Sequence, residues 1–107
     1  MKKVPGSLAA QMVLALVSIA SVAHAETDAA KAGATVYGNY CSNCHGEGLI
    51  NTTGGVTFDL RRLRAQDRDR FLSAVLDGKS QMPPWRGVLN GEQIESIWAF
   101  IRATIDR

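Results

Sequence analysis

Two thiols and an imidazole lie together in the segment Cys41-Ser42-Asn43-Cys44-His45. Two thiols three residues apart can reach the two vinyl-derived carbons on one porphyrin edge and form thioethers there. The histidine that directly follows the second thiol is then held beneath the ring, where its imidazole can bind iron. Because C-x-x-C-H is the attachment signature of c-type haem, we expect Cys41 and Cys44 to bind one covalent haem c and His45 to bind its iron on the proximal side.

Three other interpretations of this motif stay open. A redox-active dithiol also uses C-x-x-C, but it favours a βαβ context with a reactive cysteine at the start of a helix, and here the motif follows a helical pattern. A zinc site needs a fourth protein ligand, and the next acidic candidate, Glu47, is close to the motif in sequence. The third is a chance match without a cofactor. Haem attachment is the favoured interpretation, because an export signal of the kind its maturation requires precedes the motif.

The second iron ligand has few candidates once residues 1–25 are set aside. Met82 is then the only methionine and His45 the only histidine. A lone methionine is more often part of a core, but Met82 is followed by Pro83 and Pro84, which stiffen its loop. We therefore expect Met82 to bind iron on the distal side. A thioether ligand raises the reduction potential, and two occupied axial positions favour one-electron transfer without substrate turnover.

Further haem contacts are expected around the iron ligands. The haem propionates need donors, and Arg61, Arg62 and Trp85 are candidates for this role. The alternatives are a surface arginine cluster and a tryptophan that only packs. The second ring N–H of His45 should donate to a carbonyl within the loop of residues 46–57.

The first 25 residues have the order of a secretory signal. Two lysines follow the initiating methionine, residues 12–23 carry no charge, and Ala23 and Ala25 occupy the two positions that signal peptidase reads. Twelve helical residues span about 18 Å, too short for a hydrocarbon core of ~30 Å. We expect a cleavable signal peptide over residues 1–25, export to the periplasm, and one domain over residues 26–107 without a membrane span. An uncleaved N-terminal anchor is the alternative.

Charge argues against a nucleic-acid partner. The chain has 12 Lys and Arg against 10 Asp and Glu, but two of the lysines lie in the expected signal peptide. Residues 26–107 are therefore formally neutral. Their arginines gather between Arg61 and Arg70, interleaved with aspartates and without the aromatic side chains on which bases would stack.

Three helices are expected to position the motif, and no segment has an alternating strand pattern. They run from Ala29 to about residue 40, from about residue 66 to 77, and from Asn90 onward, the last with a capping box. The apolar positions expected on them are Ala29, Ala32, Val36 and Tyr40, then Phe71, Leu72, Val75 and Leu76, then Ile94, Ile97, Trp98, Ile101 and Ile105. Gly33 lies one turn before Tyr37 and would let another helix approach closely. Such a small all-α fold buries little surface by itself, which favours a large apolar cofactor.

The chain resembles the class I, monohaem c-type cytochromes over nearly all of residues 26–107. The residues that carry the resemblance are Gly33, Tyr37, Cys41, Cys44, His45, Met82, Pro83, Trp98 and Phe100. The resemblance implies a small cytochrome c fold, with three main helices wrapped around covalent haem c. It also implies that the first and last helices cross where Gly33 meets an aromatic residue, for which Trp98 is the candidate.

Two segments suggest a narrower resemblance, and one departs from the family. Residues 55–61 and 82–89 are similar to small cytochromes that accept electrons from periplasmic quinoprotein (PQQ) alcohol dehydrogenases, and to haem domains fused to such enzymes. Many members of the family have a proline whose carbonyl receives the N–H of the proximal histidine. Residues 46–60 contain no proline, so the carbonyl partner of His45 stays open within this resemblance.

The leading hypothesis is therefore a periplasmic one-electron carrier and not an enzyme. It would take electrons from a dehydrogenase and pass them to a terminal oxidase, a reductase or another cytochrome. One alternative is a haem enzyme or gas sensor in which Met82 is displaceable. Another is a cytochrome subunit of a larger redox complex.

Overall fold

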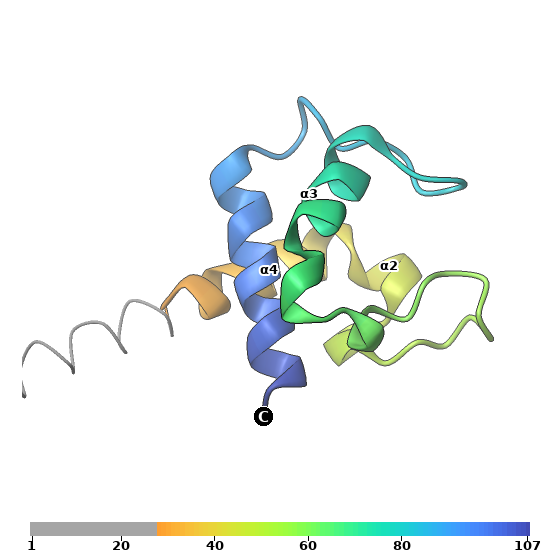
Figure 1. Cartoon of the computed structure of the whole chain (residues 1–107), viewed down its shortest axis with the longest axis horizontal. Helices are drawn as coiled ribbons and strands as arrows, with labels where there is room; N and C mark the ends of the chain where they lie inside the picture. The colour runs from red at the N-terminus through yellow and green to blue at the C-terminus, as the bar shows by residue number, and fades with distance from the viewer. Residues whose placement is uncertain (1–27) are drawn as a thin grey trace, which may run out of the picture.

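The computed structural model describes residues 28–107, which form a small bundle of helices joined by long loops (Figure 1). Residues 28–40 are helical. The other elements are α2 (Ser42–His45), α3 (Arg68–Asp77), α4 (Gly91–Ile105) and the short 3₁₀ turns η1 (Glu47–Leu49), η2 (Leu60–Arg62) and η3 (Ala65–Asp67). Over the described residues no strand forms, and only isolated bridges join Lys79 to Met82 and Arg86 to Leu89. The all-α prediction is confirmed, while the predicted signal peptide over residues 1–25 lies outside the described residues.

The 28–40 helix and α4 cross in direct backbone contact at Gly33. A Cβ atom added to Gly33 would lie 1.7 Å from the carbonyl oxygen of Ser96, so only glycine permits this approach. One turn later the buried ring of Tyr37 packs on Phe100, with ring centroids 5.1 Å apart. The prediction that Trp98 meets the glycine is wrong: Trp98 lies on another side of α4.

The buried face of the 28–40 helix also differs from the predicted one. Ala29, Ala32 and Tyr40 are exposed, whereas Gly33 and Tyr37 are buried. The close crossing with α4 determines this face, because Gly33, which has no side chain, and the large ring of Tyr37 both pack against α4. Small alanines on the adjacent face contribute little area, so their apolar character does not decide the orientation.

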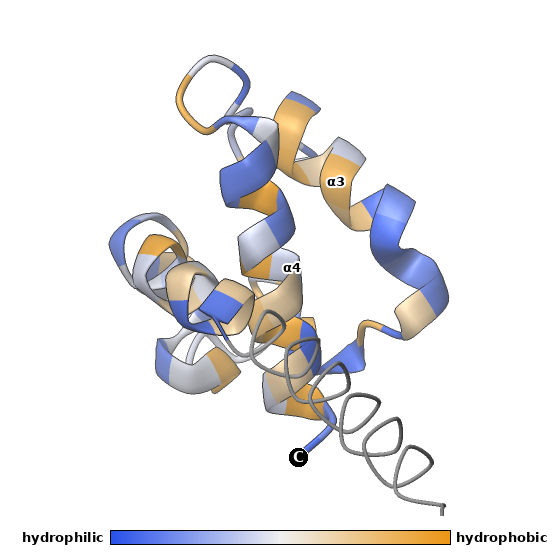
Figure 2. Ribbon diagram, turned by 90° about the vertical axis from the view of Figure 1, so that its left-hand side faces the viewer, coloured by the Kyte–Doolittle hydropathy of each residue, from blue (hydrophilic) through white to orange (hydrophobic). Residues whose placement is uncertain are grey.

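The second helix contact joins α3 to α4. The rings of Phe71 and Trp98 lie with centroids 5.2 Å apart, and both residues are buried. An ion pair between Arg68 and Glu95 joins the same two helices at the surface. Figure 2 shows hydrophilic and hydrophobic residues alternating along α4, as expected for a helix with one buried face, whereas α3 is hydrophilic at its start and mostly hydrophobic after it.

The start of α4 is the predicted capping box. The Asn90 side chain accepts from the backbone N–H of Gln93, and the Gln93 side chain accepts from the backbone N–H of Asn90, both at 2.8 Å. These two bonds satisfy backbone groups that the helix itself leaves without partners. They fix the point at which the loop after α3 ends.

The core is small and apolar. Among residues 28–107, eleven hydrophobic side chains are buried, and no polar or charged residue is. Cys41, Met82 and Trp85 are half-buried and pack against this core. No helix in the described part of the chain is long and apolar enough to cross a membrane.

Candidate functional site

The C-x-x-C-H motif forms a turn and a single helical turn at the end of the 28–40 helix. Cys41 still donates its N–H to the Tyr37 carbonyl at 2.8 Å, and the N–H of His45 returns to the Cys41 carbonyl at 3.0 Å. The tight backbone of α2 thus brings both cysteines and the histidine into one short segment. Both cysteines are free, with Cys41 half-buried against the core and Cys44 exposed.

Burial affects the first thiol of the motif. It raises the pKa of Cys41 to about 11, and the charge of the nearby Cys44 contributes to the same shift. Before a haem is attached, the Cys41 side chain is therefore a neutral thiol at physiological pH.

The His45 imidazole is held through one of its two nitrogens. Its Nδ1 lies 3.0 Å from the backbone carbonyl oxygen of Phe58. A carbonyl only accepts, so Nδ1 carries the proton and Nε2 keeps its lone pair for a metal. The expected partner range of residues 46–57 is wrong by one residue. The loop sequence has no helical or strand periodicity, so it could not show which backbone carbonyl would lie beside His45.

The residue after His45 is also fixed. The phenol of Tyr37 donates to the Gly46 carbonyl at 2.6 Å. Gly46 has φ +90°, and a Cβ atom there would lie 1.8 Å from the Ile50 carbonyl oxygen, so no other residue fits. Burial raises the pKa of Tyr37 to about 12, with the nearby Cys41 adding to the shift, so this donor stays protonated.

Met82 lies in a loop that two backbone bonds tie to the end of α3. Trp85 donates its N–H to the Val75 carbonyl at 2.8 Å, and Arg86 donates to the Leu76 carbonyl at 3.2 Å. Lys79 and Met82 exchange backbone hydrogen bonds of 3.1 and 2.9 Å, which close a tight turn just before the prolines.

An aromatic contact brings this loop to the motif. The rings of Trp85 and Tyr40 meet edge to face, with centroids 5.7 Å apart. Tyr40 directly precedes Cys41, and Trp85 follows Met82 by three residues. The structure therefore places the loop that carries Met82 beside the start of the C-x-x-C-H motif.

The two arginines proposed as propionate donors differ in their surroundings. The Arg61 guanidinium binds both carboxylate oxygens of Asp59, at 3.0 and 2.9 Å, and these bonds lower the pKa of Asp59. The Arg62 guanidinium lies 5.8 Å from the centroid of the Phe58 ring, and Arg70 lies 5.5 Å from the same centroid. Arg62 makes no ion pair with another residue in 28–107.

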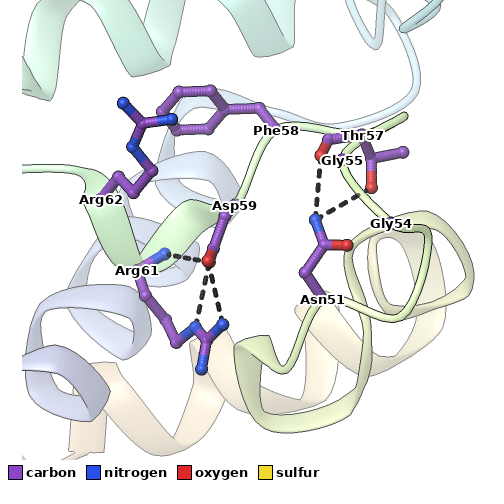
Figure 3. Close-up of a pocket in the computed structure, with 8 residues that line it drawn as sticks. All are labelled: Asn51, Gly54, Gly55, Thr57, Phe58, Asp59, Arg61 and Arg62. Carbon is purple, nitrogen blue, oxygen red and sulfur yellow. Dashed lines mark hydrogen bonds and ion pairs between the residues drawn. The ribbon is translucent and has the colours of Figure 1, made fainter.

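A hollow of about 370 Å³ lies beside the site (Figure 3). Its lining residues are Asn51, Gly54, Gly55, Thr57, Phe58, Asp59, Arg61 and Arg62. The hollow includes both candidate arginines but neither the motif nor Met82. It is thus a neighbour of the iron-ligand candidates, and Phe58, whose carbonyl binds His45, is the link between the two.

The comparisons with known proteins agree on one family. The family profile described as cytochrome c oxidase, cbb3-type, subunit III matches residues 28–101. Cytochrome c6 of Leptolyngbya boryana is 31% identical over 75 residues, which cover 67% of this chain and 88% of that protein. The chain belongs to the c-type cytochromes. Its cofactor is therefore haem c, covalently bound and containing iron.

Further relatives of this cytochrome are larger proteins. The quinohemoprotein alcohol dehydrogenase ADH-IIG of Pseudomonas putida is 33% identical over 78 residues, and ADH IIB of the same organism is 36% identical over 74 residues. The matches cover 71% and 66% of this chain but only 11% and 10% of those proteins, so the chain spans about a tenth of their length. No solved structure matches the chain.

The residues present fit a bound haem. The motif supplies two free thiols and an imidazole nitrogen, and Met82 supplies a half-buried thioether. Tyr40 and Phe58, which flank the motif and His45, each remain 40% exposed although both are large and apolar. A flat apolar cofactor would cover such side chains. Among residues 28–107 no three His, Cys, Asp or Glu side chains lie together as a zinc site would need.

Sequence reasoning missed four residues around His45: Asn51, Thr53, Thr57 and Phe58. They form the hydrogen bonds that hold the loop after the motif. The only signal was residue type, because Asn and Thr side chains often bind nearby backbone groups in loops.

Proposed function

We propose that this cytochrome carries single electrons on one haem c, which Cys41 and Cys44 bind through thioethers and which His45 and Met82 ligate. The bond from His45 Nδ1 to the Phe58 carbonyl, 3.0 Å long, carries the proposal. It fixes the tautomer that a proximal ligand needs and leaves Nε2 free to face a metal. The haem itself supplies the Fe(III)/Fe(II) couple.

The two axial residues would act on this couple in opposite directions. A firmly hydrogen-bonded imidazole is a more basic ligand and favours Fe(III). A thioether favours Fe(II) and raises the reduction potential. Met82 is held for this task by the tight turn with Lys79 and by the prolines that follow it. With both axial positions filled, substrates would have no access to iron, so we expect no catalytic turnover.

The haem propionates would find donors at Arg62, Arg61 and Trp85. Arg62 is the strongest candidate, since no carboxylate among the described residues pairs with it. Arg61 is already bound to Asp59 but has further N–H groups. The indole N–H of Trp85 makes no hydrogen bond to another described residue and stays available.

We further propose that residues 1–25 are a cleaved signal, that residues 26–107 are the working domain, and that the protein acts in the periplasm. The order of charged, apolar and small residues supports this. The likeness to quinohemoprotein alcohol dehydrogenases supports a quinoprotein alcohol dehydrogenase as the electron donor. An oxidase, a reductase or another cytochrome would be the acceptor.

Replacing Met82 tests the assignment. The wild-type protein should show a low-spin, six-coordinate spectrum and should not bind carbon monoxide when reduced at neutral pH. Met82→Ala should lower the reduction potential and admit carbon monoxide, because the thioether no longer stabilises Fe(II) or blocks the site.

The control is Gln81→Ala, which changes an exposed neighbour in the same turn and should leave both properties unchanged. An unaltered potential in Met82→Ala would show that another group is the ligand. Ready carbon monoxide binding by the wild-type protein would instead favour a haem enzyme or a gas sensor.

A further inference from the structure

Two consecutive loop residues hold His45 at two points. The Thr57 hydroxyl donates to the Cys44 carbonyl at 2.9 Å, and the Phe58 carbonyl accepts from His45 Nδ1 at 3.0 Å. The Cys44 carbonyl belongs to the peptide that leads into His45. The first bond therefore fixes the backbone of His45 and the second its ring, so the placement of residues 57–58 decides the direction of the imidazole.

The bond to Cys44 also completes the end of α2. The last carbonyls of a helix have no partner within it. The Ser42 carbonyl receives the N–H of Gly46 at 2.8 Å, and the Cys44 carbonyl receives the Thr57 hydroxyl. Without this hydroxyl the peptide before His45 would lose its only described side-chain partner.

Thr57 is itself held by Asn51 and Thr53, and we call these three residues the polar brace. Asn51 donates from Nδ2 to the Thr57 carbonyl at 2.9 Å (Figure 3), and its Oδ1 accepts from the Thr53 N–H at 2.9 Å. The Thr57 N–H donates to the Thr53 hydroxyl oxygen at 3.0 Å. All three residues are half-buried.

The two hydroxyl groups of the brace connect it to the motif. The hydroxyl oxygens of Thr53 and Thr57 lie 2.8 Å apart. Each hydroxyl has one proton, and that of Thr57 goes to the Cys44 carbonyl. The Thr53 hydroxyl has two acceptors within reach, Asn51 Oδ1 at 2.9 Å and Thr57 Oγ1 at 2.8 Å, so its proton stays within the brace, and the Thr57 hydroxyl makes the bond to the motif.

No proline ring stiffens this loop. Residues 46–60 contain no proline, and the brace surrounds Gly54 and Gly55, whose φ angles are +65° and +97°. A ring-fixed residue would hold φ by covalent geometry; here hydrogen bonds must do so.

We propose that the polar brace of Asn51, Thr53 and Thr57 positions the His45 imidazole and thereby sets the reduction potential of the haem. This inference rests on the proposed function, because it takes His45 to be the iron ligand. A short bond from Nδ1 increases the basicity of Nε2 and favours Fe(III). Loosening the brace weakens that bond and raises the potential.

The experiment uses four variants of the holoprotein. Thr57→Val removes the hydroxyl at nearly constant shape, and Thr57→Ser restores it. Thr53→Val removes the bond one step further from the motif. Thr52→Val is the matched control, because Thr52 is exposed and makes none of these bonds. Reduction potential is measured by voltammetry, and exchange of the His45 Nδ1 proton by NMR of the reduced protein.

We expect Thr57→Val to raise the potential and to speed Nδ1 proton exchange roughly fivefold to tenfold, the effect of losing one hydrogen bond. Thr53→Val should shift the potential and the exchange rate in the same direction by less, and Thr57→Ser and Thr52→Val should match the wild type.

A wild-type potential and exchange rate in Thr57→Val, or an equal shift in Thr52→Val, would overturn the inference. A wild-type spectrum without a ligated histidine would instead overturn the proposed function, and the inference with it. If Thr57→Val does not fold, the comparison of Thr53→Val with Thr52→Val tests the inference instead: a raised potential in Thr53→Val alone supports it, and equal potentials overturn it.

Discussion

At the scale of single residues, the neighbourhood of His45 is determined by contacts rather than by charge. Its ring meets the Phe58 carbonyl, and the next residue in the chain is fixed by Tyr37. The buried phenol of Tyr37 is a group here whose titration is coupled to folding in a measurable window. Its pKa is raised from 10.0 to about 12, chiefly by burial; the smaller contribution of the Cys41 thiol is lost once that sulfur forms a thioether.

This shift predicts a loss of stability in alkali. An unfolded tyrosine loses its proton near pH 10, whereas folded Tyr37 keeps its proton until about pH 12. Between these values the unfolded state binds fewer protons, so the free energy of unfolding falls as pH rises, by up to about 2 kcal/mol in all. Urea unfolding at several pH values from 9 to 12 measures it.

Tyr37→Phe is the comparison that isolates this residue. At pH 7 it should cost about 1 kcal/mol through loss of the bond to the Gly46 carbonyl. Its disadvantage should shrink as pH passes from 10 to 12, because phenylalanine has no proton to lose. Parallel stability curves for the two proteins would mean that Tyr37 does not titrate in this range.

The reach of sequence reasoning is clear at this scale. Side chains with a fixed spacing were predictable, because the distance between Cys41, Cys44 and His45 is set by the chain itself. The Phe58 carbonyl was not, since every residue has a carbonyl and only the folded loop selects one. The polar brace was hidden for the same reason.

At the scale of elements, the crossing of the 28–40 helix with α4 holds the motif in place. The helix ends where Cys41 begins, so any shift at Gly33 is carried to the site. The close approach at Gly33 could be predicted from the sequence, because a glycine one helical turn before an aromatic residue is a local sequence pattern. The predicted aromatic residue at the crossing, Trp98, was wrong. Trp98 and Phe100 are two residues apart on α4 and point to different sides: Phe100 packs on Tyr37, and Trp98 packs on Phe71 of α3.

Gly33→Ala should therefore be strongly destabilising. The added Cβ would overlap the Ser96 carbonyl oxygen, and the helices must separate, at a cost of roughly 2–4 kcal/mol. The measurement is the free energy of unfolding in urea, together with the reduction potential.

Gly38→Ala, in the same helix, is the control. A Cβ atom there meets nothing within 4 Å, and alanine is the better helix former by up to about 1 kcal/mol. This substitution should leave stability unchanged or raise it. Equal losses from the two substitutions would show that helix propensity, not the crossing, governs the effect.

At the scale of the whole molecule, we expect the cofactor to complete a small polypeptide core. Seven of the eleven buried apolar residues lie on the helices, and the loops of residues 46–67 and 79–90 contribute the other four, Leu49, Leu60, Leu63 and Leu89. A domain of this size is marginal without additional packing. The all-α class and the family followed from the sequence, whereas the loop courses depend on packing that helical periodicity does not specify.

Removing the two thiols proposed to attach the haem, as Cys41→Ser with Cys44→Ser, tests this dependence. The haem should separate from the protein on a denaturing gel stained for haem. The thermal midpoint should fall by at least ~10 °C, because loss of a tightly bound group removes several kcal/mol of stability from a small domain.

Asn43→Ala is the matched control, since it alters an exposed residue between the cysteines and keeps their spacing. It should retain stained haem and the wild-type midpoint. A double variant that melts like the wild type would show that the polypeptide core is sufficient alone.

The placement of the two tryptophans has an optical consequence. Trp85 contacts Tyr40 beside the motif, and Trp98 contacts Phe71 between α3 and α4. Haem quenches indole emission by energy transfer, more completely at shorter range. An increase in Trp85 fluorescence during unfolding would report release of the Met82 loop. An increase in Trp98 fluorescence would report separation of α3 from α4. Two variants that each keep a single tryptophan would therefore show whether the Met82 loop or the contact between α3 and α4 opens first.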